Sequence, residues 1–359
     1  MKKSLVLMLI SAVFLFLSGC GPEPVEETKK ETKAAAAQAT AEAASQNSAN
    51  PKLVFRYGEV NGEDNIITKT GRKFAEYVKE LSGGRMGVQV YPNDALGNDR
   101  TSLRALKEGG TTVDMYRGNT NALTGYGFRK LNLFGLPYVF RDREGMWRVL
   151  EDENLGRAFL SEGSEVGAGM VGLFYTDEGP RNLFTSQEIK GISDIQGKKI
   201  RVPESVVMMD TISALGARPI SMPYSQLYDA IKNKVVDGGE NPLPAYVTNK
   251  LYEVAPYYLL SSHVYSPGIV LMAEDKWDSL SPEDQQILLE AGRRASEWNK
   301  QEIQAEEARL LKELNELGVT VIELTPEEEA MAREQEAIVR TSFSPGLEDV
   351  MKQIMEIQR

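Results

Sequence analysis

Hydrophobic positions recur with two different periods in the part of the chain that follows residue 50. Short apolar runs at residues 53–58 and 86–91 have the length of strands, and the segment 66–81 between them has apolar positions at helical spacing. A second helical pattern follows, and residues 113–116 are again strand-like. This β-α-β-α-β order predicts an α/β fold with a largely parallel sheet and helices on its faces.

The later part of the chain has shorter apolar runs. Strands are predicted at residues 171–175, 200–202 and 319–324. Thr325 and Pro326 are residue types that favour an N-cap and a first helical position, so a helix is predicted to begin there. Another helix ends the chain, and the sequence contains no internal repeat.

One predicted helix is much longer than the others. Ser281 suits its N-cap, Pro282 suits its first position, and acidic residues follow in the first turn. The pattern continues to Leu317, and at 1.5 Å per residue it is roughly 50 Å long, enough to pass along two lobes of a protein. One face of this helix is apolar, and it consists of Ile287, Leu288, Ala291, Ala295 and Trp298.

The start of the chain has the pattern of a secretory signal. A basic start precedes an apolar run at residues 5–17, which is shorter than the roughly 20 residues of a membrane-spanning helix. The phrase Leu-Ser-Gly-Cys, which ends at Cys20, resembles the lipobox of bacterial lipoproteins. The resemblance implies that residues 1–19 are a lipoprotein signal peptide and that Cys20 is lipidated; plain secretion with cleavage nearby is the alternative. Residues 20–50 have almost no large apolar side chains and are predicted to form a flexible tether.

Composition narrows the classes of function. The chain has 41 basic and 52 acidic residues, a formal net charge of −11, which argues against nucleic acid and against a polybasic membrane patch. Cys20 is the only cysteine and His263 the only histidine, so a catalytic thiol in the body and a multi-histidine metal site are excluded. No phosphate-binding loop of the Walker type is present. The sequence therefore predicts no enzyme and no cofactor.

Arg201 is the first candidate for binding chemistry. It lies in the predicted strand 200–202, and Pro203 ends that strand because proline has no N–H to donate. Ligands of α/β folds bind beyond this end of the strands. The donors of an arginine form a planar fork that fits a carboxylate. The alternative is an ordinary arginine at the surface or in an ion pair.

Several phrases around Arg201 occur in the order typical of one protein family. They are Lys-Ile-Arg-Val-Pro from residue 199, Ala-Leu-Gly-Ala from residue 214, Met-Pro-Tyr from residue 222 and Val-Val-Asp-Gly-Gly-Glu-Asn-Pro from residue 235. With these phrases the chain resembles the solute-binding subunits of TRAP (tripartite ATP-independent periplasmic) transporters, of the dicarboxylate-binding type. The resemblance covers most of the chain after the predicted tether.

The resemblance implies a two-lobed periplasmic solute-binding protein fold, type II-like, whose lobes are joined by crossing strands and a long helix. Lobe I is expected to comprise residues 51–178 and 267–306, and lobe II residues 179–266 and 307–359. A solute would bind in the cleft between the lobes, which would close over it by a hinge motion.

The resemblance also implies roles for individual residues. Arg201 would hold the carboxylate of the solute, Arg181 would add positive charge, and Asn241 would form a hydrogen bond from the second lobe. Glu204 would touch the solute or pair with an arginine. Tyr224 would pack against the solute, or else be a tyrosine of the core or of the rim of the cleft.

The loop after the third predicted strand adds further candidates. Arg117 would face either the ligand or a neighbouring carboxylate, and Asn119 lies beside it. Binders of sialic acid are expected to have Glu where Asn119 stands, which disfavours that ligand. Asp99, in the phrase Leu-Gly-Asn-Asp-Arg, is also expected at the ligand. His263 is expected to have a structural or hinge role.

The resemblance implies an extracytoplasmic, lipid-anchored protein that captures a carboxylate-bearing organic acid and delivers it to TRAP membrane permease subunits. The acid would be a C4-dicarboxylate or a sugar acid such as a uronate. A lipid-anchored sensor that presents a solute to a receptor is one alternative, and an exported enzyme on the same fold is another.

Overall fold

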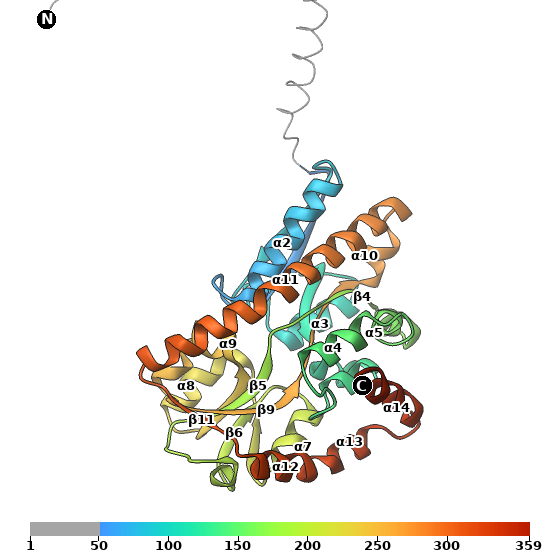
Figure 1. Ribbon diagram of the computed structural model, residues 1–359. Helices are drawn as coiled ribbons and strands as arrows, with labels where there is room; N and C mark the ends of the chain where they lie inside the picture. The colour runs from blue at the N-terminus through green and yellow to red at the C-terminus, as the bar shows by residue number, and fades with distance from the viewer. Residues whose placement is uncertain (1–50) are drawn as a thin grey trace, which may run out of the picture. The chain divides into compact units, whose positions relative to one another are not determined.

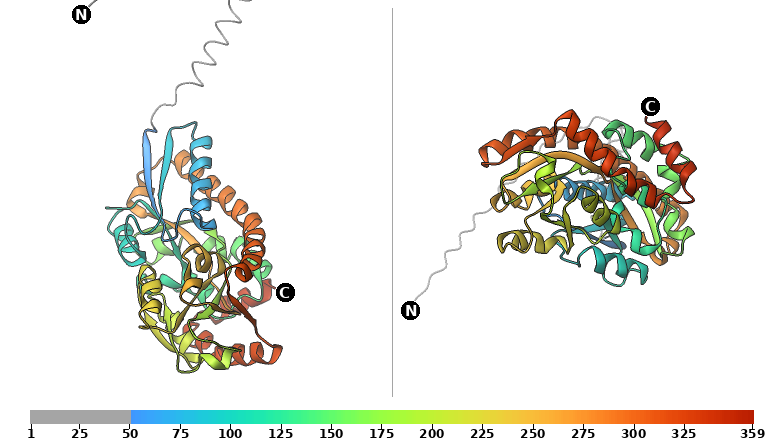
Figure 2. Two further views of the ribbon diagram at one scale, coloured as in Figure 1. Left: turned by 90° about the vertical axis from the view of Figure 1, so that its left-hand side faces the viewer. Right: turned by 90° about the horizontal axis from the view of Figure 1, so that it is seen from below.

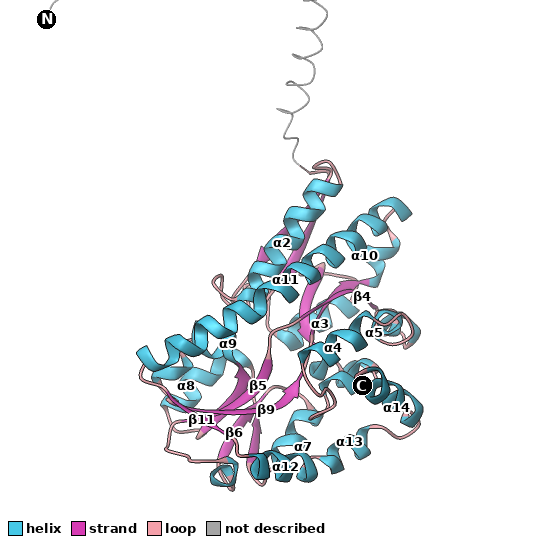
Figure 3. Cartoon of the chain, in the orientation of Figure 1, coloured by secondary structure: helices cyan, strands magenta, loops and turns pink. Residues whose placement is uncertain are grey.

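Residues 51–359 are the part of the chain that the computed structural model describes. The predicted signal peptide, Cys20 and the tether lie outside the described residues. In the described part, two β-sheets form the interior and helices surround them (Figure 3).

Five strands form the first sheet: β1 (Leu53–Gly58), β2 (Met86–Tyr91), β3 (Met115–Asn119), β4 (Met170–Thr176) and β10 (Gly268–Ala273). Their order in space is β2-β1-β3-β10-β4. β1 runs parallel to β2 and β3, whereas β10 is antiparallel to β3 and β4. The prediction of parallel strands therefore holds for the first three strands and is wrong for the rest of this sheet, because β10 enters it from the second sheet.

Six strands form the second sheet: β5 (Pro180–Thr185), β6 (Lys199–Val202), β7 (Arg218–Ser221), β8 (Gly238–Pro242), β9 (Tyr257–Tyr265) and β11 (Thr320–Glu323). Their order is β11-β9-β5-β8-β6-β7. β5 runs antiparallel to β8 and β9, and the other pairs are parallel.

The predicted strand at residues 113–116 begins later than expected. The carboxylate of Asp114 accepts hydrogen bonds from the backbone N–H and the Nε of Arg56, at 2.8 and 2.9 Å. The aspartate thus anchors β1, and β3 begins only at Met115.

Helices of the first half of the chain are α2 (Ile66–Leu81), α3 (Asp99–Lys107), α4 (Arg143–Glu151), α5 (Gly156–Phe159) and α6 (Glu162–Glu165). Those of the second half are α7 (Val206–Ala214), α8 (Leu227–Lys232), α9 (Leu243–Thr248), α10 (Glu274–Asp278), α11 (Pro282–Glu316), α12 (Pro326–Gln335), α13 (Ala337–Phe343) and α14 (Glu348–Ile357). The predicted helices that begin after Ser281 and Thr325 are confirmed, and both cap side chains accept a backbone hydrogen bond.

Helix α11 is one uninterrupted helix of 35 residues. It packs along α2 and β4 of the first sheet and continues to α9 and β11 of the second (Figures 1 and 2). The middle of its predicted apolar face, Leu288, Ala291 and Ala295, is fully buried. Among residues 51–359 no helix combines the length and the apolar character needed to cross a bilayer.

The chain passes between the two sheets after β4 and again after β9. Asn299 of α11 fixes the first passage: its side chain accepts from the backbone N–H of Asp177 at 2.6 Å and donates to the carbonyl of Asp177 at 3.1 Å. At the second passage, Asn119 donates to the carbonyl oxygen of Ser266 at 3.0 Å. Both passages are therefore held by side chains of neighbouring elements.

The C-terminal helices return to the first half of the chain. In Figure 1, α14 lies beside α4. Gln358 connects them, since its amide donates to the carbonyl of Val139 at 3.0 Å and accepts from the N–H of Arg141 at 2.7 Å. The lobe boundaries given above stay a prediction.

Leu288→Ala tests the packing of α11. Because Leu288 is fully buried, we expect this variant to lose about 2–5 kcal/mol of unfolding free energy. Leu311→Ala, on the same helix, is the control: Leu311 is 37% exposed, and its truncation should cost about 0.5 kcal/mol or less. Urea unfolding of both variants measures the difference, and equal losses would contradict the burial of this face.

Candidate functional site

The guanidinium of Arg201 lies at the end of β6 and is buried, with 3% of the residue exposed. Its Nε and Nη2 both donate to the carbonyl oxygen of Met222, at 3.0 and 2.7 Å. The ring of Tyr224 lies 5.4 Å from its Cζ, within the range of a cation–π interaction. In the described part of the chain, no carboxylate forms an ion pair with Arg201.

The electrostatic surroundings of Arg201 are unfavourable for a cation. Burial lowers the pKa of its guanidinium to about 10; the negative charge of Glu240 opposes this shift, and the positive charge of Arg181 adds to it. A buried charge that lacks an opposite partner costs several kcal/mol. An anion bound next to Arg201 would therefore compensate this unfavourable buried charge.

Arg181 of β5 lies beside Arg201 but already has a carboxylate. Its Nη2 donates to Oε1 of Glu240 at 2.9 Å, its Nε donates to the other oxygen, and Nη2 also reaches the backbone carbonyl of Glu240 at 3.1 Å. Burial acts to raise the pKa of Glu240, but Arg181 and His263 together outweigh it, and the pKa lies below its ordinary value. The charge of Arg181 is thus largely neutralised within the protein.

His263 lies behind this pair. Its Nδ1 is 2.8 Å from the hydroxyl of Ser261, and its Nε2 is 3.7 Å from Glu240. Although a serine, a histidine and a glutamate come together, each is at most 2% exposed, so no substrate can reach the hydroxyl in this structure. Burial lowers the pKa of His263, which is therefore neutral at pH 7 and packs as a structural residue.

A cavity of about 240 Å³ lies next to Arg201. Asp99 and Leu103 of α3 line it from the first sheet, and Arg201 and Met222 line it from the second. Asp99 accepts a hydrogen bond from the hydroxyl of Tyr116 at 2.8 Å. Burial raises its pKa, against the opposing effects of Tyr116, Arg117 and Arg201. The cavity thus contains a cation without an ion pair on one side and a carboxylate on the other.

Glu204 lines the same cavity but is already paired. Both its oxygens accept from Arg100, the oxygen Oε2 from Nε at 2.9 Å. Next to this ion pair, the hydroxyl of Ser205 donates to the carbonyl of Asn121 at 2.6 Å. These contacts join the element after β6 to segments of the first sheet. Of the two alternatives for Glu204, the structure has the pairing with an arginine.

Tyr224 and Asn241 lie close to the arginines. The Tyr224 hydroxyl donates to the carbonyl of Ala245 at 3.2 Å, and its ring covers Arg201. Burial raises the pKa of this hydroxyl, while Arg201, Arg181 and Asn241 act in the opposite direction. Asn241 of β8 is 6% exposed.

Arg117 faces two carboxylates rather than open space. Its Nε lies 3.3 Å from Oε2 of Glu59, and its Nη2 lies 3.3 Å from Oε2 of Glu178. Burial would lower the pKa of Arg117, but these carboxylates outweigh it and raise the pKa. Asn119 donates to Glu178 at 2.6 Å and also contacts Ser266. Arg117 and Asn119 thus hold the segments that connect the sheets.

Sequence reasoning missed Glu59, Glu178 and Arg100. Glu59 directly follows β1 and Glu178 follows β4, so both lie where strands end, which is the signal that could have found them. Arg100 follows Asp99 in the same helical turn, but its sequence gives no sign that it pairs with a residue 104 positions later.

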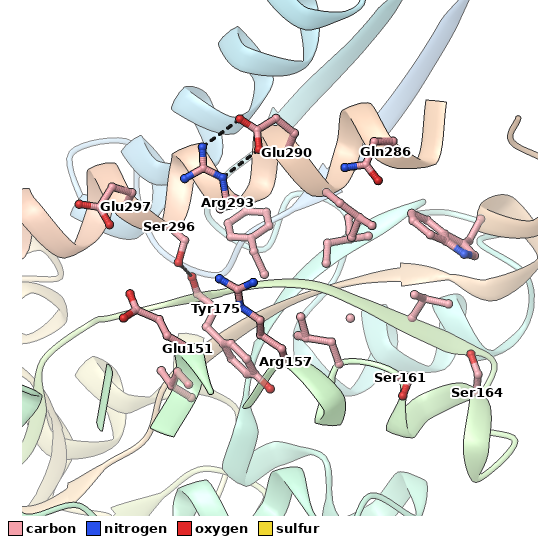
Figure 4. Close-up of a pocket in the computed structure, with 18 of the residues that line it drawn as sticks. Glu151, Arg157, Ser161, Ser164, Tyr175, Gln286, Glu290, Arg293, Ser296 and Glu297 are labelled. Carbon is pink, nitrogen blue, oxygen red and sulfur yellow. Dashed lines mark hydrogen bonds and ion pairs between the residues drawn. The ribbon is translucent and has the colours of Figure 1, made fainter. Parts of the chain in front are cut away.

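Another cavity, of about 660 Å³, lies on the outside of β4 between α4, α6 and α11 (Figure 4). Its charged groups pair with one another or with their neighbours; Arg293 binds Glu290 at 2.8 Å and Arg157 binds Glu153 at 2.7 Å. None of the predicted site residues lines it. It therefore lacks the unpaired cation that marks the cavity beside Arg201.

Two α/β units, with a polar cavity lined by an arginine that has no ion pair among the described residues, are typical of two-lobed solute-binding proteins. Residues 57–344 match the family model of bacterial extracellular solute-binding protein, family 7 (DctP), and the chain belongs to this family. The C4-dicarboxylate-binding periplasmic protein DctP of Rhodobacter capsulatus is 30% identical over 279 residues, which are 77% of this chain and 82% of the relative.

Solved structures of TRAP periplasmic solute-binding proteins have the same fold. One from Bradyrhizobium sp., in complex with α/β-D-galacturonate, has a TM-score of 0.79 and 31% identity, and the match covers 84% of this chain and 99% of that chain. The sugar acid binding protein DctPAm from Advenella mimigardefordensis, in complex with galactonate, has a TM-score of 0.79 and 30% identity, with 85% and 97% covered.

Asp94 is a further acidic residue near this site. Its Oδ1 is buried and has no hydrogen-bond partner among the described residues. Burial, together with repulsion by Asp99 and Glu59, raises its pKa to about 7. Asp94 has a backbone φ of 56°, a left-handed conformation that Asn also tolerates, and the preceding Asn93 has a φ of 58°.

Asp94→Asn tests this shift. Because the pKa of Asp94 is higher in the folded state than in the unfolded state, its contribution to the unfolding free energy is fully present below about pH 4. This contribution is lost as the pH rises to about 7. The variant cannot ionise, so we expect it to be about 1–3 kcal/mol more stable than the wild type at pH 8, a gain that shrinks at pH 5. Urea unfolding at both pH values measures it, with the exposed Asp229→Asn as control. An equal gain at both pH values would contradict the assignment.

Proposed function

We propose that this protein is the extracytoplasmic solute-binding lipoprotein of a TRAP transporter. It captures a small organic acid by its carboxylate in the cleft between the two lobes and delivers it to the membrane permease subunits. Residues 1–19 direct export, Cys20 carries the lipid, and residues 20–50 tether the folded body to the membrane.

The observation that carries the proposal is the buried guanidinium of Arg201, which among residues 51–359 has only the carbonyl of Met222 and the ring of Tyr224 as partners. A carboxylate would accept two parallel N–H donors from the fork and compensate the buried charge. Asn241 and Arg181 would complete the contacts from the second lobe. The relatives support this chemistry, because galacturonate and galactonate are both carboxylates.

The cavity is built for a solute that touches both lobes. Asp99 lies on one side and Arg201 on the other, so contacts to both form only when the cleft is closed. The passages after β4 and β9 are the natural hinges, and the Arg100–Glu204 ion pair joins the two sides of the cavity. A ligand that bridges the sides shifts the equilibrium toward the closed form, which the permease would then recognise.

Native mass spectrometry of the purified protein, before and after denaturation, is the direct test. We expect release of a small carboxylic acid. If no molecule is released and a thermal-shift screen of organic and sugar acids is also silent, the proposal fails.

Arg201→Ala should weaken binding of the solute about 100-fold or more, because a buried, charge-assisted contact is lost. Arg201→Lys should also weaken it, since a point charge does not reproduce the fork. Isothermal titration calorimetry measures both effects.

The control for these variants is Arg218→Ala, since Arg218 lies exposed on the neighbouring strand β7 and should leave the affinity unchanged. Removal of an unpaired buried cation should not unfold the ligand-free protein, so Arg201→Ala is expected to keep its full stability or gain some. Wild-type affinity in a folded Arg201→Ala protein would refute the role of this arginine.

A further inference from the structure

The arginines around the cleft differ in whether a carboxylate of the protein forms an ion pair with them. Arg181 is bound by Glu240, Arg117 is shared between Glu59 and Glu178, and Arg100 is bound by Glu204. Arg201 has no such partner in the described part of the chain. The cleft therefore offers one strong site for a negative charge and no second one.

The group on the other side of the cavity is a carboxyl. Asp99 and Arg201 line the same cavity of about 240 Å³. Among the described residues, only the hydroxyl of Tyr116 donates a hydrogen bond to the Asp99 side chain. Its second oxygen, Oδ2, accepts no side-chain hydrogen bond from these residues. The nearby Asp94 adds a further carboxyl with a buried, unpartnered oxygen.

We infer that the solute is a polyhydroxylated monocarboxylate, whose single carboxylate binds Arg201 and whose hydroxyl groups donate to Asp99, and that C4-dicarboxylates are disfavoured. The inference rests on the proposed function and specifies its substrate class. It makes Asp99 a specificity-determining residue of the cleft.

The charge balance excludes a second carboxylate at the far end of the cavity. Such a group would lie against Asp99 without a free cation, and like charges that face each other in a buried site suppress binding. A hydroxyl, in contrast, donates a charge-assisted hydrogen bond to a carboxylate, as Tyr116 already does.

Membership of the family does not distinguish a sugar acid from a C4-dicarboxylate as the solute. The relatives include a protein that is named for C4-dicarboxylates and others that were solved with sugar acids. The preference for a monocarboxylate is inferred from this chain's own carboxylates. Three of the four arginines form ion pairs with glutamates, and Asp99 lines the same cavity as the fourth, Arg201.

Calorimetry of the full-length wild-type protein with a panel of acids tests the inference. The panel contains D-galactonate, D-glucuronate and D-erythronate, the dicarboxylates succinate and L-malate, and the amino acid L-glutamine. We expect at least one of the three sugar acids to bind at least 10-fold more tightly than either dicarboxylate.

Other outcomes overturn the inference in distinguishable ways. Tightest binding of succinate or malate, lost in Arg201→Ala, would refute the substrate class and leave the proposed function standing. Tightest binding of glutamine would show that Asp99 receives an ammonium group rather than a hydroxyl. No binding of any sugar acid of the panel would refute the inference; if denaturation also releases no acid and the wider thermal-shift screen is silent, the proposed function is refuted as well.

Asp99→Asn separates specificity from stability. Loss of the charge should weaken the best sugar acid about 10-fold or more and leave the affinity for succinate unchanged or increased. Asp210→Asn, at an exposed position of α7, is the matched control and should change neither affinity. If Asp99→Asn weakens both ligands by the same factor, Asp99 has only a structural role and the inference is wrong.

Discussion

The structure depends on how three buried arginines are compensated inside a largely acidic protein. Burial of a guanidinium is tolerated only when carboxylates or strong acceptors surround it. The chain meets this condition for Arg117 and Arg181 with its own glutamates, which bridge strands and the passages between the sheets. At Arg201 no carboxylate of the described residues meets this condition, so the rule that stabilises the framework also favours an anion at the proposed binding site.

The framework and the site share residues because both lie at strand ends. Arg117 lies in the middle of β3 and Glu178 follows β4, so their ion pair joins β3 to the segment that leads into the second sheet. Asn119 joins the two passages through Glu178 and Ser266. A movement of one sheet relative to the other would act directly on these contacts, and the site is therefore coupled to the geometry of the hinge.

The sequence predicted the strands β1 and β2, helix α2, the caps of α11 and α12, and the two-lobed class, because these depend on local patterns and on motifs with fixed spacing. It did not predict the mixed direction of the sheets, since β10 joins β3 and β4 from far along the chain. For the site, the position of Arg201 at a strand end was readable. The partners of Arg117 and Glu204 were not, because each pair joins residues more than 50 positions apart.

The central place of β10 also affects the order in which the chain can fold. β3 and β4 do not pair with each other; both pair with β10, residues 268–273, which lies between them. During synthesis, the first sheet therefore stays incomplete until about three quarters of the chain has been made, and pairing at such long range is slow. A late central strand keeps the nascent chain unfolded for longer, the state in which a polypeptide can be threaded through a narrow export channel before it acquires its structure.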